Sequence, residues 1–222
     1  MGHFDHEYLK FLRELPANNN RDWFNENKVR FKSSVEQPFH ALIDDLLDRL
    51  SGEMKGLESI DAKHCVFRIY RDVRFSKDKE PYKTHMSALV TSSGRKGMSD
   101  PGLYIESSAE HLRLYSGAYQ LEKDALHRVR TAIKDHPQEF SRVISNKKFV
   151  DNFGEIRGEK NKRIPKEFED AAEKQPLIFN KNFYFFKEWP ADKILDENLV
   201  KELLGTYKAA EPVNTFLFKA IK

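Results

Sequence analysis

The chain has 222 residues, a length that suits one large domain or two small ones, and its 39% hydrophobic residues can form a substantial core. Lysine and arginine number 38 against 35 aspartate and glutamate residues, so the net charge of +3 excludes a strongly basic nucleic-acid packaging protein. No apolar run is long enough to span a membrane and the first residues lack the pattern of a signal peptide, so we expect a cytoplasmic protein with no membrane partner.

Two helical segments are predicted at the start of the chain. Residues 5–15 carry an apolar stripe at helical spacing, and Pro16 ends it. Over 21–50, apolar residues recur every three, four or seven positions, which predicts a long helix that Pro38 kinks or splits. Phe24 lies in phase with the later apolar residues of this helix, so we expect it to be more buried than the tryptophan before it.

Strands are predicted in the middle of the chain, with helices on both sides. The predicted strands cover residues 65–75, 86–91, 103–107, 111–115 and 182–188. The later helices are predicted over 123–134 and 137–144 and from Asp196 onward, with an interruption at Pro212. Without a βαβ alternation or a linker-like stretch, the prediction is a single α+β domain over 1–222. Its central sheet is mainly antiparallel and flanked by N-terminal and C-terminal helices.

The densest charge in the chain lies in residues 68–83, RIYRDVRFSKDKEPYK. Six of these residues are Arg or Lys, three are Asp or Glu and two are Tyr. Such a density of charge is costly unless each group is solvated, paired or facing a ligand. The segment is therefore the first place to look for a site.

Arg71 is the most informative residue of this segment, because it lies in the apolar phase of the predicted strand between Ile69 and Val73. A buried guanidinium needs a carboxylate, a group of carbonyls or a bound anion. One interpretation is a structural ion pair with a neighbouring carboxylate, and the other is a bound anion.

The opposite face of the predicted strand carries Arg68, Tyr70 and Arg74, about 7 Å apart at each step. If the lysines that follow fold back over this face, they form a concave cationic patch for phosphate or carboxylate, with tyrosines that can stack on a ring. The alternative is a solvated strand whose own carboxylates neutralise it. The candidate ligand-binding residues are Arg68, Arg71, Arg74, Lys77, Lys79, Tyr82, Lys83, Arg21 and Trp23.

A second basic cluster comprises Lys147, Lys148, Arg157, Lys160, Lys162, Arg163 and Lys166. It is interpreted as a surface loop, unless it faces the first segment and the two form a groove for a polyanion. Glycine-rich phosphate loops, GxSxG and HExxH are all absent from the sequence, so no catalytic residue, cofactor or metal ligand is assigned. Cys65, with apolar neighbours, is expected to be an inert buried thiol.

The stretch RDVRFSKDKEPYKT at 71–84 resembles a bacterial family of uncharacterised proteins, domain of unknown function 2461. Three further segments are similar to that family: NNNRDWF at 18–24, LYSGAY at 114–119 with Arg128 and Arg130 on the following helix, and KRIPK at 162–166. Lys166 stands where the family pattern continues with glycine. The resemblance spans nearly the whole chain, roughly 4–221, and implies one domain, but it implies no reaction, cofactor or catalytic residue.

Two functional hypotheses follow. In the first, a small phosphorylated or otherwise anionic molecule binds, or is acted on, at the basic and aromatic patch. In the second, the protein is a non-catalytic structural or protein-interaction domain, and RDVRFSKDKEPYK is an internal ion-pair network. Nucleic acid ranks below a small anion, because only about three cations of 68–83 exceed its acids and no base-reading motif occurs. Whether the protein is an enzyme, and its oligomeric state, are left open.

Overall fold

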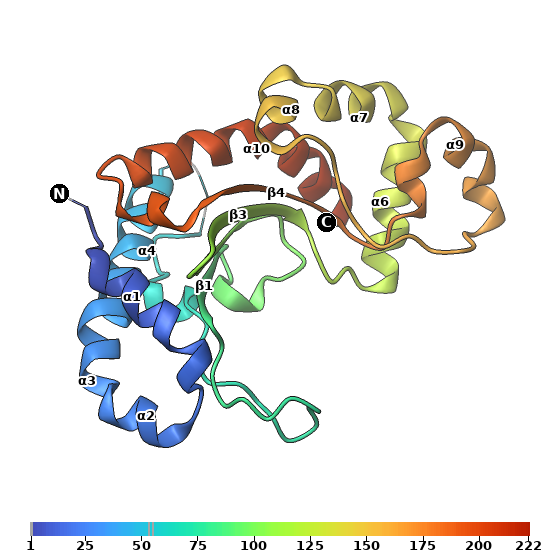
Figure 1. Ribbon diagram of the computed structural model, residues 1–222. Helices are drawn as coiled ribbons and strands as arrows, with labels where there is room; N and C mark the ends of the chain where they lie inside the picture. Colours follow the sequence, from blue (N-terminus) through green and yellow to red (C-terminus); the bar gives the residue numbers. More distant parts are fainter. Residues whose placement is uncertain (1, 53, 55) are drawn as a thin grey trace. The chain divides into compact units, whose positions relative to one another are not determined.

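The computed structural model describes residues 2–52, 54 and 56–222 and has an α+β fold (Figure 1). Four strands form one antiparallel sheet in the order β1-β2-β3-β4. Their bounds are β1 His85–Val90, β2 Leu103–Ser108, β3 His111–Ala118 and β4 Phe183–Pro190. Each lies where a strand was predicted, and the predicted fold class, with helices before and after the sheet, is confirmed.

The main helices lie where the apolar periodicities predict them, whereas α5 was not predicted. The helices are α1 His6–Glu14, α2 Arg21–Glu26, α3 Lys28–Phe31, α4 Gln37–Leu50, α5 Ala62–Cys65, α6 Lys123–Asp135, α7 Pro137–Ile144, α8 Lys147–Phe153, α9 Glu169–Lys174 and α10 Leu199–Ile221. In the described part of the chain, none of these helices combines the length and apolar character needed to cross a membrane.

The chain is divided into two compact units, each assembled from three separate stretches. Unit 1 comprises residues 1–96, 104–114 and 188–204, and unit 2 comprises 97–103, 115–187 and 205–222. The single domain over 1–222 stays a prediction, which the division into two units does not test.

In unit 1, short-range polar contacts fix the N-terminal helices over an aromatic core. Asp5 and Asn20 cap α1 and α2, since their side chains accept hydrogen bonds from the backbone N–H groups of Glu7 and Trp23. Arg30 then ties α3 to α1, because its Nε lies 2.5 Å from Glu7 Oε1 and its Nη1 2.5 Å from Glu14 Oε2. The Arg30 guanidinium lowers the pKa of the Glu14 carboxyl, so the carboxylate form is favoured.

Two prolines were predicted to disturb helices, with different outcomes. Pro38 lies in the first turn of α4, directly after a π-helical turn over Lys32–Glu36, so regular α-helix is interrupted just before this proline, whereas the break in the predicted helix is a turn at Asn27 that was not predicted. The prediction at Pro212 is wrong, since α10 runs through it without ending. Ala210 and Val213, both with no exposed surface, keep that helix packed on both sides of the missing N–H.

In unit 2, the C-terminal strand is held by aromatic packing and by one glycine. Phe149 and Phe153 of α8 each lie 4.8 Å, centroid to centroid, from Phe185 of β4. Gly117 of β3 has φ +96°, and a β-carbon on it would stand 2.2 Å from the carbonyl oxygen of Phe183. The strands can approach this closely only because position 117 has no side chain.

Candidate functional site

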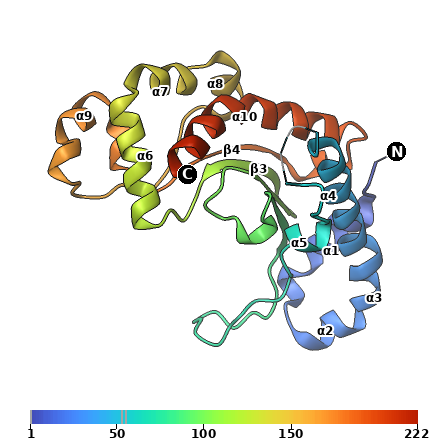
Figure 2. The same ribbon diagram turned by 180° about the vertical axis from the view of Figure 1, so that it is seen from behind.

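The segment 66–84 is an irregular hairpin in unit 1 and not a regular strand, so the predicted strand over 65–75 is wrong. Val66 bridges Ala88 and Tyr70 bridges Tyr82, both antiparallel, and pairing ends at a hydrogen bond from the Arg71 N–H to the Pro81 carbonyl. Residues 72–80 form the tip of the hairpin, which extends away from the helices of unit 1 in both views (Figures 1 and 2). Local side-chain pairs, described below, replace strand pairing in this tip.

The asparagine-rich stretch before α2 holds the returning arm of the hairpin. Asn19 Nδ2 donates to the Tyr82 carbonyl at 3.0 Å, and Asn19 Oδ1 accepts from the Tyr82 N–H at 3.1 Å. One side-chain amide thus satisfies both backbone groups of Tyr82, as a neighbouring strand would. This contact explains why two motifs about sixty residues apart are both part of the site region.

An aromatic stack joins the same two segments. Phe24 has 1% of its surface exposed, and its ring lies 4.0 Å from the Tyr82 ring at an interplanar angle of 14°. Tyr70 lies 5.9 Å from Phe24 in an edge-to-face contact. Trp23 is only half-buried, against Phe11, so the predicted order of burial is confirmed. Phe24 fixes the hairpin on α2 by stacking on an arm of the hairpin itself.

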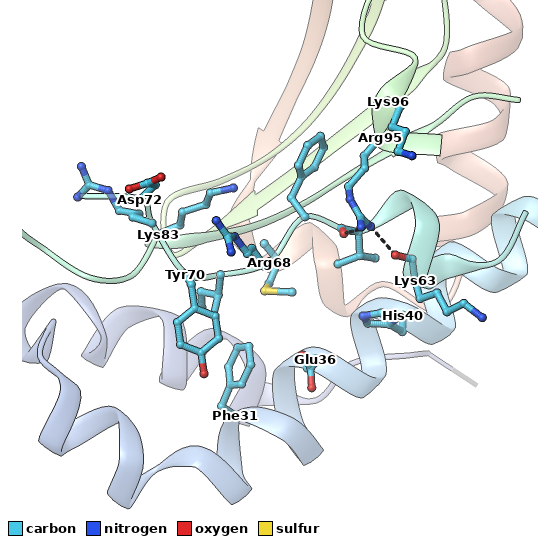
Figure 3. A pocket seen from close by; sticks show the side chains of 15 residues that line it. Phe31, Glu36, His40, Lys63, Arg68, Tyr70, Asp72, Lys83, Arg95 and Lys96 are labelled. Atoms are coloured by element: carbon cyan, nitrogen blue, oxygen red, sulfur yellow. Dashed lines mark hydrogen bonds between the residues drawn. The ribbon is translucent and has the colours of Figure 1, made fainter. Parts of the chain in front are cut away.

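A pocket of about 960 Å³ opens between this hairpin and helices α3 to α5 (Figure 3). Its lining is Phe31, Glu36, His40, Lys63, Val66, Phe67, Arg68, Ile69, Tyr70, Arg71, Asp72, Lys83, Met86, Arg95 and Lys96, all of unit 1. The lining thus combines an apolar and aromatic floor with six Lys or Arg side chains and only two carboxylates. Such a wall favours a ligand with negative charge and an apolar or planar body.

Arg68 and Lys83 form the electrostatic centre of the pocket. Burial lowers the pKa of the Lys83 ammonium, and the nearby Arg68 guanidinium lowers it further. The Lys83 Nζ lies 5.3 Å from the centre of the Phe67 ring, a cation–π contact. The Arg68 side chain has no hydrogen bond or ion pair among the described residues. The two cations repel each other, an effect that Glu106 partly offsets at Lys83, and a bound anion would relieve the remaining repulsion.

Arg95 and Lys96 bring further cations to the pocket, and the sequence interpretation missed both. They lie in the 3-10 turn Gly94–Lys96, where Arg95 Nη1 donates to the Lys63 carbonyl at 2.5 Å and the Val66 carbonyl at 3.3 Å. Gly94 has φ +55°, and a β-carbon there would stand 2.5 Å from the His64 carbonyl. Basic residues between two glycines after an apolar strand were the available signal.

The predicted site residues divide into those that line the pocket and those that do not. Arg68, Arg71 and Lys83 line it. Arg74, Lys77 and Lys79 lie on the tip of the hairpin, Tyr82 is buried under Phe24, and Arg21 and Trp23 belong to α2 outside the pocket wall. Lys63, Arg95, Lys96, Phe31, Glu36 and His40 were not predicted.

Ion pairs account for several charges of the segment. Arg71 Nη1 lies 2.6 Å from Asp78 Oδ2, with 27% of the Arg71 side chain exposed, so this arginine is neither deeply buried nor unpaired. Arg74 makes a forked contact with Asp72, at 2.9 Å and 2.6 Å, and lowers the pKa of that carboxyl. Lys79 Nζ donates to a backbone carbonyl of the tip. Arg71 thus forms an ion pair, as one interpretation predicted, but the predicted burial is wrong, and its partner lies in the tip and not on a neighbouring strand.

A second group of titratable side chains adjoins Lys83 on the sheet of unit 1. Glu106 of β2 accepts from His111 Nε2 at 3.0 Å, and His85 Nε2 lies 3.9 Å from the other carboxylate oxygen. Arg113 Nη1 is 3.5 Å from Glu106. Burial lowers the pKa of His85, against the opposing effect of Glu106. Among the described residues no group of His, Cys, Asp and Glu is arranged to hold a metal, and Arg113 already occupies the carboxylate here.

Cys65 and the second basic cluster lie elsewhere. Cys65 is buried, and burial raises the pKa of its thiol to about 12, as expected for an unreactive core cysteine. The second basic cluster belongs to unit 2, whereas the pocket belongs to unit 1.

Comparison with known proteins gives one result. A family described as a conserved hypothetical protein, DUF2461, matches residues 7–216, nearly the whole chain. No curated protein matches the chain.

Proposed function

Since the chain belongs to the DUF2461 family of conserved hypothetical proteins, we propose from the geometry of the pocket alone that unit 1 binds a small phosphorylated or otherwise anionic molecule. The observation that carries this proposal is the pair Arg68 and Lys83. Both line the pocket, the Arg68 guanidinium lowers the pKa of the Lys83 ammonium, and the Arg68 side chain makes no hydrogen bond or ion pair within the described chain.

The arrangement of the lining suits such a ligand. Arg68 offers a planar fork of donors that matches phosphate or carboxylate, and Lys83 adds a compact charge held over Phe67. Tyr70, with 47% of its surface exposed, presents a ring at the pocket edge on which a base or sugar could stack. Figure 3 shows Arg68 and Lys83 on the hairpin side and Arg95 with Lys96 on the far side of the same pocket.

A structural role for the hairpin is the second candidate function, and the ion pairs of its tip favour it. Arg71 with Asp78 and Arg74 with Asp72 neutralise four of the charges of the segment without any ligand. In this alternative, the protein is a structural or protein-interaction domain, and the pocket cations are solvated. Arg68 and Lys83 distinguish the two functions, because neither takes part in the ion pairs of the tip.

The test is a thermal-shift and calorimetric screen with inorganic phosphate, pyrophosphate, nucleotides and sugar phosphates. A ligand of the folded state at about 100 times its Kd stabilises by about 2.7 kcal/mol, which is readily measured as a rise in Tm. We expect at least one of these anions to stabilise the protein, and Arg68→Ala and Lys83→Met each to remove that effect.

The matched control is Lys77→Ala, which removes one positive charge from the exposed tip of the same hairpin, outside the pocket lining. It should retain the ligand effect. If Lys77→Ala and Lys83→Met weaken binding equally, attraction is a matter of net charge and the pocket is not the site. If no anion stabilises the protein, the structural role is favoured.

A further inference from the structure

Unit 2 carries an aromatic surface on its part of the sheet, which we call the aromatic platform: Tyr115, Tyr119, Tyr184 and Phe186. Tyr184 and Phe186 alternate along β4 with the buried residues that face α8, so they lie on the opposite face of the strand. Tyr115 on β3 is 4.9 Å from Phe186 and 6.5 Å from Tyr184.

The rings of the platform are partly accessible and continuous with one another. Tyr119, with 44% of its surface exposed, meets Tyr184 edge-to-face at 5.9 Å, while the other three rings are half-buried. Aromatic rings that stay partly accessible at one surface offer faces on which planar groups can stack.

A basic segment lies directly beside the platform. Arg157 bridges Tyr184 and Lys160 bridges Asn180, which places residues 157–160 alongside the chain that enters β4. The Arg157 guanidinium is 4.2 Å from the centre of the Phe186 ring. We call Arg157, Lys160, Lys162, Arg163 and Lys166 the loop cations. All five are exposed, and no ion pair or side-chain hydrogen bond is recorded for any of them among the residues that the structure describes.

We propose that the aromatic platform and the loop cations together bind single-stranded nucleic acid. The occupant follows from the two chemistries that lie side by side: uncompensated cations for a repeating anionic backbone, and ring faces for the bases between its phosphates. An acidic protein surface would use the cations, but acidic side chains alone supply no planar group for the rings. Duplex nucleic acid likewise hides its bases from such a platform.

This site is independent of the pocket of unit 1 and does not rest on the function proposed there. In the sequence interpretation nucleic acid ranks below a small anion, because only about three cations of 68–83 exceed its acids and no base-reading motif occurs. The loop cations differ, because the one carboxylate within 157–166, Glu159, is paired with Lys181 at 3.2 Å outside that segment. The aromatic rows of β3 and β4 could not be placed next to the loop cations without the fold.

The test is fluorescence anisotropy of the whole protein with labelled oligo(dT) and oligo(rU) of about 15 nucleotides, a length within the usual site sizes. Three to five phosphate contacts predict a log–log salt slope of about −2 to −3.5 for a single strand. Tyr119→Leu and Tyr184→Leu should each weaken binding by about fivefold or more, while Tyr119→Phe, which keeps the ring, should bind like the wild type.

The loop cations are tested by Lys160→Ser with Arg163→Ser, which should reduce the steepness of the salt slope by about 1.4. The matched control is Lys147→Ser with Lys148→Ser on α8, which removes the same charge from the helix packed on the other face of β4 and should leave the slope unchanged. Equal binding of duplex and single strand, or unchanged binding after loss of the tyrosine rings, would overturn the proposal. Melting curves of each variant confirm that it is folded.

Discussion

Replacing Phe24 by alanine tests the packing that holds the hairpin of the pocket in place. The ring has 1% of its surface exposed and lies 4.0 Å from Tyr82, 5.1 Å from Phe31 and 5.9 Å from Tyr70. Phe-to-Ala changes in cores cost about 3–5 kcal/mol, with the cost rising as the surroundings fail to close the cavity. Asn19 holds both backbone groups of Tyr82, so that ring cannot easily collapse into the cavity. We therefore expect a loss of about 4 kcal/mol.

The assay is urea unfolding followed by tryptophan fluorescence, since Trp23 adjoins Phe24 in the chain and packs on the same Phe11 ring. With an m-value of about 2 kcal/mol/M, the midpoint should fall by about 2 M. Phe24→Leu, which conserves most of the volume, should cost less than about 1.5 kcal/mol. Val29→Ala on the neighbouring α3, where 82% of the side chain surface is exposed, is the control and should change stability by less than about 0.5 kcal/mol. A loss below about 1 kcal/mol for Phe24→Ala would refute the packing argument.

Three further predictions concern single features of the two units. Gly117→Ala should prevent stable folding of unit 2, because its β-carbon meets a backbone oxygen. Gly154→Ala, also at positive φ but with open space around it, should cost only about 1–2 kcal/mol in melting experiments. If the two variants lose similar stability, the close approach of the Phe183 carbonyl is not what position 117 requires glycine for. The folded-state pKa of His85 lies below its ordinary value of 6.5, among Glu106, Lys83 and His111, so the unfolded chain binds the proton first and stability should fall as the pH drops below about 6.5. Unfolding of His85→Gln measured between pH 7 and 5 should show a shallower fall, and an identical pH dependence would show that His85 is not its source. A double-mutant cycle between Arg71 and Asp78 should give a coupling energy below about 1 kcal/mol, since 53% of the Asp78 side chain is exposed. A coupling of several kcal/mol would favour the structural role of the hairpin.

Local patterns in the sequence were sufficient for most of the fold. Periods of two and of three to four residues located β1 to β4 and the main helices, because burial of one face sets those periods. The hairpin was missed, because alternation in 65–75 is the same whether the chain pairs over its whole length or only near Tyr70. In the structure the chain pairs only near Tyr70, and Arg71 and Arg74 pair with carboxylates of the tip. Pro212 was misjudged because tertiary packing of α10 offsets the lost hydrogen bond.

The sequence predicted only part of the candidate site, and the electrostatics of the folded segment explain why. The cation count of 68–83 indicated a basic site, but pairing with acids only two to seven residues away removes Arg71 and Arg74 from the available charge. What distinguishes Lys83 is burial beside Arg68 and over Phe67, a property of the folded hairpin and not of the residue type. Lys83→Met should therefore stabilise the unliganded protein by up to about 1 kcal/mol in urea unfolding while it abolishes the response to anions. A residue that costs stability and is needed for binding is the signature of a functional site, whereas a lysine kept for structure would lower stability when removed.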